Sequence, residues 1–515
     1  GPGAQVDTSP SPAYYGYALN PFENYLLSGK AMIGLTDRLR LDVSPYFWYG
    51  YGTGGLQQTT LAESNSSTVV HGGIADINGD GDRSDTVLVY RGSLTQTFRP
   101  GINAALTYVL DNHKINGGVW FERARHRQTQ PAVTVGNDGG VTDIWLGGNL
   151  LRYNDGSTYN GRNQNTVSTG ESVFVQDTID LLSGKLQVTP AFSYRRIKRE
   201  FSNYANSGTA GSGAAFGSSG VDYSVERTYG APLPSLAVSL QASDRLQVFS
   251  SLAKNFKAPG NFEYQSLATG VTYANGVGTS TGMLPLTVKE ETSVNLDLGA
   301  RYKGDWYRAS ATAFYNKFKD RIASSYDPAT TLTHDFNVGD STTKGLEIEA
   351  GTVPIAGFSG YASLTYTKST LDENMLSTDL TKPYLTAGKQ FPDTPKGMAA
   401  LSLQYANGPY LLNVSGKYTT SRTLTLTNDV VIPGFTTVDF NAAWKLPNPS
   451  GNGFKNPIIR LNVSNIFNRQ YFMANAGSGS NVQIANANIV TGAATTPFYY
   501  AGAPRFASMT FQVDY

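Results

Sequence analysis

Apolar and polar residues alternate along much of the chain, in segments of about ten or more residues. In Ala507–Tyr515 every odd-numbered residue is apolar and every even-numbered residue is polar. Tyr410–Tyr418 and Ile459–Phe467 follow a similar alternation. Successive side chains of a β-strand point to opposite faces, so this pattern predicts strands with one apolar and one polar face. A tilted strand of this length is long enough to cross the hydrocarbon of a membrane.

The connections between these segments are of two kinds, and the two kinds alternate along most of the chain. Short turns are expected at Thr36–Leu39, Leu110–Lys114, Leu182–Lys185, Ala242–Arg245, Lys303–Trp306, Thr352–Phe358, Ala406–Tyr410 and roughly Leu446–Pro457. Long polar connections are expected at Thr53–Asp85, Pro131–Thr166, Asn203–Val225, Ala258–Glu290, Leu371–Pro395 and Arg469–Ala501. A soluble β-sandwich would also show alternating strands. Short turns at one end of the sheet and long loops at the other are instead typical of an outer-membrane barrel.

Aromatic clusters lie near the loop ends of the expected strands, at Tyr46–Tyr49 and Phe498–Tyr500. Tyrosine and tryptophan prefer the membrane interface, so we interpret these clusters as part of an aromatic girdle rather than as core aromatics. We therefore predict an all-β fold, a transmembrane antiparallel β-barrel with roughly 17 strands between about Asn24 and Tyr515. Residues 1–23 are expected to form an N-terminal loop or a cleavage scar, because the chain begins with Gly1 rather than with Met.

The amino-acid composition narrows the class of protein further. The chain has 55 Gly, 31 Tyr and 24 Phe but only 15% charged residues, which suits a β-rich protein with tight turns and a partly apolar surface. Its formal charge of +1 argues against a nucleic-acid partner. Mean hydropathy is −0.27 and no stretch approaches the ~20 apolar residues of a membrane-spanning helix, which excludes a helical membrane protein. The absence of cysteine excludes disulfides and thiolate metal sites.

Five segments resemble motifs of the TonB-dependent receptor family, and they occur in that family's order. They are NFKAPGNFEYQSL (Asn255–Leu267), NVGDSTTKGLEIEA (Asn337–Ala350), FPDTPKGMAALSLQY (Phe391–Tyr405), LNVSNIFNRQYF (Leu461–Phe472) and YYAGAPRFASMTFQVDY (Tyr499–Tyr515). Two residues of these motifs also have a physical explanation. Gly345 inside a strand indicates a bend or a close approach, and Asn468 suits a turn where a strand leaves the membrane.

The resemblance implies a barrel of about 22 strands in the bacterial outer membrane that imports a scarce ligand, most often a ferric siderophore. It also implies a plug domain inside the barrel, through which an inner-membrane TonB complex supplies energy. The plug and its energy-coupling segment have no counterpart in this sequence. By the family's count the strand near Asn24 would be about the sixth. The expected partners are outer-membrane lipid, a small-molecule ligand and, through the plug, the TonB complex.

The segment DINGDGDRSD contains the strongest local signal for a bound ion. Hard oxygen ligands at alternate positions, with glycines for the turn, are typical of Ca²⁺ loops. The twelfth position, where such loops carry a bidentate acid, is Val87, so a solvated acidic turn is the alternative. No cofactor is required by the family, and Ca²⁺ is the one ion that the pattern indicates. The candidate ligands are Asp76, Asn78, Asp80, Asp82 and Asp85.

Two basic runs could contact an anionic ligand, because arginine forms charge-assisted contacts with carboxylates. The first contains His126 together with Arg123, Arg125 and Arg127, and the second begins at Arg195 and Arg196. The alternative is a lumen-facing or strand-end charge run. We take Arg123, Arg125, His126, Arg195 and Arg196 as the candidate ligand-binding residues.

The sequence leaves three classes of function open. The leading hypothesis is TonB-dependent uptake, with a ferric siderophore as ligand. The alternatives are a passive porin or surface-binding barrel, and an outer-membrane enzyme. An enzyme would need a Ser/His/Asp-type set at the strand ends, and none is recognisable, so we predict no enzymatic activity.

Overall fold

The structure, a computed structural model, describes residues 16, 19–54, 58–63, 73–74, 76–136, 140–205, 220–265, 267–274, 277–327, 332–375, 385–448, 453, 455–473 and 500–514. Phe498, Tyr499 and Tyr515, which the sequence placed in an aromatic cluster and in the last strand, lie outside these residues. Within this part of the chain, no helix is long and apolar enough to cross a membrane.

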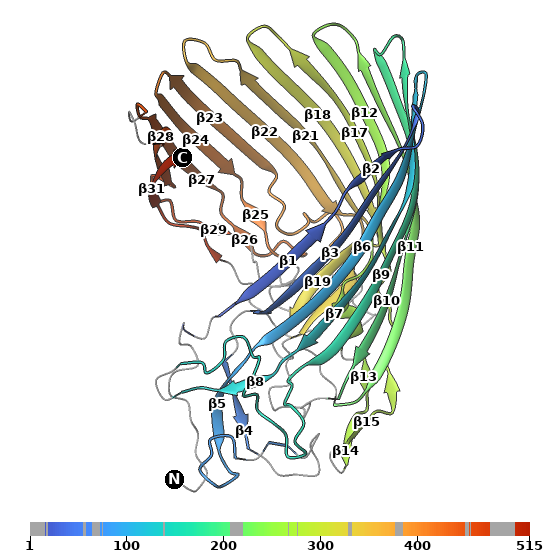
Figure 1. The fold of residues 1–515 in the computed structure, drawn as a ribbon, viewed down its shortest axis with the longest axis vertical. Coiled ribbons are helices and arrows are strands. Elements are labelled where there is room, and N and C mark those ends of the chain that lie inside the picture. Colours follow the sequence, from blue (N-terminus) through green and yellow to red (C-terminus); the bar gives the residue numbers. More distant parts are fainter. Residues whose placement is uncertain are drawn as a thin grey trace.

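One large antiparallel sheet dominates the fold, and from β3 onward each strand pairs with the next strand of the sheet along the chain (Figure 1). Its strands are β1 (Phe22–Ser28), β2 (Ala31–Gly34), β3 (Leu39–Gly54), β6 (Ser93–Leu110), β7 (His113–Thr129), β9 (Asn163–Leu181), β10 (Leu186–Asn203), β11 (Tyr223–Gln241), β12 (Leu246–Lys257), β17 (Glu291–Lys303), β18 (Tyr307–Lys319), β21 (Ser341–Thr352), β22 (Phe358–Leu371), β23 (Gly397–Asn407), β24 (Tyr410–Thr419), β27 (Phe435–Lys445), β28 (Lys455–Ser464) and β31 (Phe506–Asp514).

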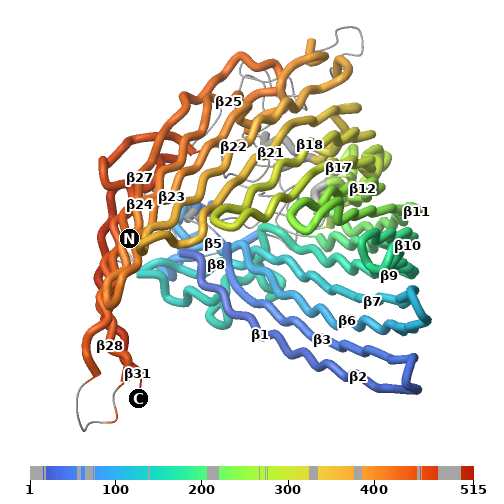
Figure 2. The backbone as a smooth tube through the Cα atoms, turned by 90° about the horizontal axis from the view of Figure 1, so that it is seen from above, coloured from blue at the N-terminus to red at the C-terminus, as the bar shows by residue number. Residues whose placement is uncertain are grey.

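The sheet contains 18 strands, but β1 and β2 pair with successive parts of the same neighbour, β3. Together they form one crossing that is interrupted at Gly29 and Lys30, where the Gly29 N–H donates to the carbonyl of Pro45. The sheet therefore makes 17 crossings, which confirms the predicted number. Among the described residues no pairing joins the first strand to β31, and Figure 2 shows the sheet as a curved wall that is open between these two edges.

All short connections lie at one end of the sheet and all long connections at the other (Figure 1). Seven of the eight predicted short turns are confirmed, and the eighth, Leu446–Pro457, lies partly outside the described residues. Two further long connections, between β18 and β21 and between β24 and β27, were missed by the sequence analysis. The strands differ in length: β9 has 19 residues, whereas β31 has 9.

Several long connections contain short strands of their own. The largest unit is a three-stranded sheet of β4 (Gln58–Ala62), β5 (Thr86–Arg91) and β8 (Ala132–Thr134). Its side chains form an apolar core in which Val89 and Ala132 are fully buried. The remaining elements are β13 (Ala268–Thr269), β14 (Thr272–Ala274), β15 (Val277–Thr279), β16 (Gly282–Met283), β19 (Ile322–Asp327), β20 (Leu332–Asn337), β25 (Arg422–Thr423), β26 (Val431–Ile432), β29 (Phe472–Met473), β30 (Tyr500–Ala501) and the 3₁₀ helix η3 (Asn261–Tyr264).

The large sheet has an apolar face that is exposed in the isolated chain. On β24, Leu412 and Val414 are 42% and 44% exposed, and on β31 Met509 is 77% exposed. The opposite face carries hydrogen-bonded polar residues such as Glu122 and Tyr229, and outer loops pack against it. A soluble sheet would cover such an apolar face with a second layer. The arrangement therefore indicates that the apolar face meets lipid and that the polar face lines a lumen.

Aromatic side chains mark both edges of the apolar face. At the loop end, Tyr49 lies between Tyr25 and Phe98, with ring centroids 6.1 and 5.1 Å apart. At the turn end, pairs such as Tyr410–Trp444 and Phe358–Tyr405 form a second band. Successive side chains of β3 point to opposite faces. Within the predicted cluster Tyr46–Tyr49, Phe47 and Tyr49 therefore face outward, and Tyr46 and Trp48 face the lumen.

The two aromatic bands are separated by the thickness of a membrane. On β6 the outward face runs from Phe98 to Tyr108 and includes the exposed Ile102 and Leu106. At about 3.3 Å per residue and a tilt of about 45°, this segment spans about 23 Å along the membrane normal. Outer-membrane barrels carry an apolar band about 25 Å tall between their aromatic girdles.

Candidate functional site

A polar network on the lumenal face joins β3, β6 and β7 near the loop end. Glu122 is buried. It accepts a hydrogen bond from the Tyr46 hydroxyl at 2.5 Å and forms an ion pair with Arg99 at 2.8 Å. The Trp120 indole N–H donates to the same Tyr46 hydroxyl at 3.0 Å. Glu122 thus has a cation and a hydroxyl partner, which offsets the cost of burying its charge.

Arg195 on β10 extends this network toward the lumen. Its guanidinium lies over the Trp120 ring, 5.7 Å from the centroid. The side chain is exposed, and it makes no hydrogen bond or ion pair with any other described residue. A lumenal arginine beside an indole, with unused N–H donors, can contact an anionic ligand that carries flat groups.

The structure does not bring the five predicted ligand-binding residues together. Arg195 and His126 face the lumen, whereas Arg123, Arg125 and Arg196 face outward. The reason is the period of two residues along a strand, which places sequence neighbours on opposite faces. His126 bonds to the Thr97 hydroxyl at 2.7 Å, and Arg196 pairs with Glu171 at 3.0 Å.

A loop segment is docked on the lumenal face next to this network. Glu263 of η3 is buried and receives hydrogen bonds from Tyr229 at 2.8 Å and Arg227 at 3.2 Å. The Tyr229 and Tyr264 hydroxyls lie 2.9 Å apart, and the Tyr223 hydroxyl donates to the Tyr264 carbonyl. Burial raises the pKa of Glu263, although the Tyr229 hydrogen bond and Arg227 act in the opposite direction. The motif segment Asn255–Leu267 therefore bends from β12 onto the inner wall.

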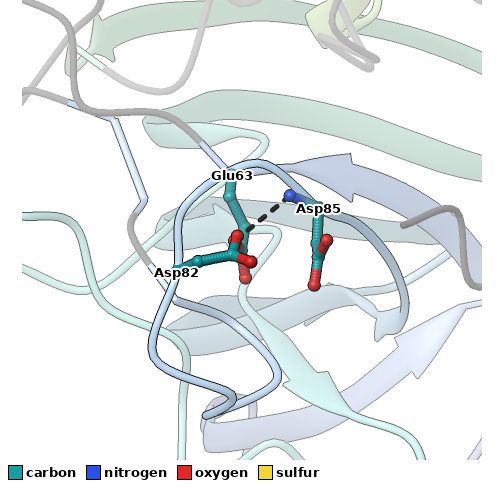
Figure 3. A group of neighbouring side chains, drawn as sticks. All are labelled: Glu63, Asp82 and Asp85. Carbon is teal, nitrogen blue, oxygen red and sulfur yellow. Dashed lines mark hydrogen bonds between the residues drawn. The ribbon is translucent and has the colours of Figure 1, made fainter. Parts of the chain in front are cut away.

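Three carboxylates gather in the outer loops beside the β4–β5–β8 sheet. Oxygens of Glu63, Asp82 and Asp85 lie within 4.8 Å of one another, and Glu63 and Asp85 are 7% and 1% exposed (Figure 3). Glu63 accepts hydrogen bonds from the backbone N–H groups of Ile77 at 2.5 Å and Asp85 at 3.3 Å. Ionised carboxylates at this separation repel one another, and a cation bound between them offsets the repulsion.

The comparison with protein families is decisive for the class of protein. Residues 3–466 match the family described as "TonB dependent receptor-like, beta-barrel". The chain belongs to the TonB-dependent receptor family. The predicted resemblance, the all-β barrel fold and the outer-membrane location in a Gram-negative bacterium are thereby confirmed.

Individual relatives are more distant. The ferric enterobactin receptor PirA of Pseudomonas aeruginosa is 35% identical over 102 residues, which is 18% of this chain and 14% of PirA. Among solved structures, the copper transporter OprC aligns with a TM-score of 0.64 at 16% identity. The siderophore receptor PiuA from Acinetobacter baumannii aligns with a TM-score of 0.61 at 16% identity. Each alignment covers 96% of this chain but only 65% of the other chain.

The lumenal wall of this receptor barrel also has a cavity at the turn end, with charged side chains in its lining. It has a volume of about 710 Å³, and Arg301, Arg308, Glu349 and Tyr361 are among its lining residues. Glu349 accepts hydrogen bonds from Ser310 at 2.8 Å and from the Tyr361 hydroxyl at 3.0 Å. Glu349 therefore faces the lumen rather than lipid.

Of the predicted calcium ligands, the structure brings Asp82 and Asp85 into one group, and the Asn78 amide donates to Asp85 at 2.6 Å. Asp76 is exposed and Asp80 accepts a hydrogen bond from the Asp82 N–H, and neither carboxylate belongs to that group. Sequence analysis missed Glu63. No spacing rule could find it, because Glu63 reaches the site from the end of β4 through the β4–β5 pairing.

Proposed function

We propose that this chain forms the barrel wall of a receptor that takes up a ferric siderophore in a TonB-dependent manner. Two of the relatives that it resembles are named as a ferric enterobactin receptor and as a siderophore receptor. The family and its structural neighbours are receptors and transporters, which favours import over a passive porin and over an enzyme. In this proposal a plug domain fills the lumen and transmits energy from the TonB complex.

The observation that carries the choice of ligand is Arg195 above Trp120 at the loop end of the lumen. Many iron chelates are polyanionic and carry flat aromatic groups. A guanidinium supplies charge-assisted hydrogen bonds to such a chelate, and an indole supplies a stacking surface. Arg99 and Tyr46 lie in the same network and extend the polar surface.

The test uses the neighbouring residues Arg195 and Arg196, because they have the same charge but face opposite sides of the sheet. We expect Arg195→Ala to weaken the binding of ferric enterobactin about tenfold, the loss of one charge-assisted contact. Arg196→Ala should leave the affinity unchanged. Binding is measured by intrinsic fluorescence quenching of the 515-residue chain in detergent. Equal affinities for both variants and the unsubstituted chain would refute the proposed binding surface.

We also propose that the acidic loop binds Ca²⁺ through Glu63, Asp82 and Asp85, with the Asn78 amide N–H holding Asp85 in place. Carboxylate oxygens are ligands that Ca²⁺ prefers, and Glu63 supplies the acid that the twelfth loop position lacks. Asp76 and Asp80 then belong to the surrounding turn, or bind only after the loop rearranges.

A chelator experiment separates calcium binding from a solvated acidic turn. We expect Ca²⁺ to protect the β4–β5–β8 sheet from protease and a chelator to remove the protection. Glu63→Gln, which keeps the size of the side chain, should abolish the response, whereas Asp76→Asn should change it much less. If neither Ca²⁺ nor chelator alters the cleavage of the unsubstituted chain, the calcium proposal is wrong.

A further inference from the structure

Three arginines form a ladder on the outward face of β7: Arg123, Arg125 and Arg127. The residues between them face the lumen, as His126 shows by its bond to Thr97. The outward face continues from the ladder into apolar residues, with Phe121 43% exposed. The ladder therefore lies on the same surface of the sheet as the membrane band, directly beyond the apolar residues.

The height of the ladder can be read from strand register. Arg125 lies opposite Phe98 on β6, and Phe98 contacts Tyr49 in the upper aromatic girdle. Arg123 is one outward position closer to the membrane centre, and Arg127 is one closer to the loops. Aromatic girdles lie at the level of the lipid headgroups. Because the long loops are extracellular, this level belongs to the outer leaflet.

Arg123 and Arg125 have guanidinium N–H groups that make no hydrogen bond to the described residues. Arg127 is engaged by the Gln164 carbonyl, the Asn163 side chain and the Tyr204 ring. Arg125 uses only its Nε, which donates to Asn165 at 3.3 Å. Arg123 makes no hydrogen bond or ion pair with the described residues, and both Arg123 and Arg125 are exposed.

No carboxylate faces the ladder from the paired strands. Arg123 lies opposite Thr169, and Arg125 lies opposite Val167. The nearest acid on this surface is Glu171, one outward position away on β9, and it is already paired with Arg196 at 3.0 Å. Elsewhere on the same surface Lys198 is paired with Glu200 and Glu226. The ladder thus differs from its surroundings in having positive charge that no described carboxylate neutralises.

We propose that Arg123 and Arg125 bind a phosphate group of an outer-leaflet lipid headgroup, with the lipid's acyl chains lying over Phe121 and Val173. A cation at the headgroup level, next to hydrocarbon, is stabilised by an anionic partner, and a guanidinium binds phosphate oxygens in a bidentate manner. Val173 on β9 is 53% exposed and continues the apolar surface below the ladder. The phosphate and the acyl chains of one lipid therefore match the order of charged and apolar residues on this face.

This lipid site lies on the opposite side of the sheet from Arg195 and is independent of the imported ligand. It gives Arg123 and Arg125 a role that does not require access to the lumen. Arg196 is excluded from the site because its charge is already neutralised by Glu171.

The test measures lipid retention by native mass spectrometry of the delipidated 515-residue chain in detergent. The probes are lipid A with both phosphates and the same glycolipid after removal of its phosphates. We expect about tenfold stronger retention of the phosphorylated form, and about tenfold weaker retention by Arg123→Ala/Arg125→Ala. Arg123→Lys/Arg125→Lys, which keeps the charge, should lose only part of the effect.

A matched control removes two lumenal cations at the turn end, Arg301→Ala/Arg308→Ala, and should retain the phosphorylated lipid fully. A heat-modifiability gel confirms that each variant is folded. Equal retention of the two lipids by the unsubstituted chain would overturn the proposal. Equal retention of the phosphorylated lipid by Arg123→Ala/Arg125→Ala and by Arg301→Ala/Arg308→Ala would also overturn it. Complete displacement of the lipid by inorganic phosphate would show a free-phosphate site and would also overturn it.

Discussion

Gly345 is the position in β21 at which a side chain has no room. A Cβ built on it would lie 2.0 Å from the Tyr366 carbonyl oxygen and 2.5 Å from the Phe314 ring. The backbone oxygen is held by the β21–β22 pairing and cannot move away. The close approach that the isolated glycine predicted from sequence is therefore confirmed.

We predict that Gly345→Ala destabilises the folded barrel by about 1–3 kcal/mol, the usual cost of overpacking. Gly351 on the same strand is a matched control, because its nearest neighbour would lie at 3.6 Å, an ordinary contact distance. Thermal unfolding in detergent should show a lower Tm for Gly345→Ala than for Gly351→Ala. Equal Tm values would mean that the sheet accommodates the methyl group.

The docking of η3 on the lumenal wall should depend on pH through Glu263. Because burial raises the pKa of Glu263 above its ordinary value of 4.5, the docked state binds a proton more readily than the undocked state. Docking is therefore most stable below pH 4.5 and weakens as the pH rises through the raised pKa. Hydrogen exchange of residues 261–264, corrected for its intrinsic pH dependence, should become faster over this range. Glu263→Gln should remove the pH dependence, and persistence of the dependence in that variant would contradict the assignment.

Residue roles were harder to predict from the sequence than strand positions. His126 and its flanking arginines are adjacent in sequence, so they were grouped into one basic patch, but alternation divides them between lumen and lipid. The same division affects Arg195 and Arg196. The alternation itself was available from the sequence, but assigning each face needs the apolar positions of neighbouring strands, such as Phe98 and Val173.

At the scale of elements, turn chemistry and alternation were sufficient to predict most of the sheet. The turn after β28 forms where Asn468 was expected to end the strand, with Asn465 and Asn468 both at positive φ. Long-range pairings could not be predicted in this way. β8 has only three residues, and it is a strand because it pairs with β5, more than 40 residues earlier in the chain.

The β4–β5–β8 sheet should unfold locally without unfolding the barrel, because it has its own apolar core. Val89→Asp places a charge where the side chain is fully buried, and we expect it to make this loop region sensitive to protease. Thr60 is exposed on β4, so Thr60→Asp is the control and should remain resistant. In both variants the barrel should keep its heat-modifiable migration on a gel. Loss of that migration in Val89→Asp would show that the two units are not independent.

At the scale of the whole molecule, one apolar face and one polar face continue across all 17 crossings of the sheet. The apolar face ends in aromatic side chains at both rims, and the polar face carries the lumenal networks around Glu122 and Glu349. These two compartments account for the separation of Arg195 from Arg123 and for the two different ligands proposed for them. Both sites therefore depend on which face of the sheet meets hydrocarbon.

The most direct test labels Ile102 and Asn103, neighbours on β6, after each is replaced singly by cysteine. The chain contains no other cysteine, so each label reports one position. After reconstitution into liposomes, a fluorophore at position 102 should be quenched by brominated lipid and not by iodide in the buffer. A fluorophore at position 103 should be quenched by iodide and not by brominated lipid. Equal quenching at both positions by either agent would contradict the lipid-facing and lumenal faces assigned here.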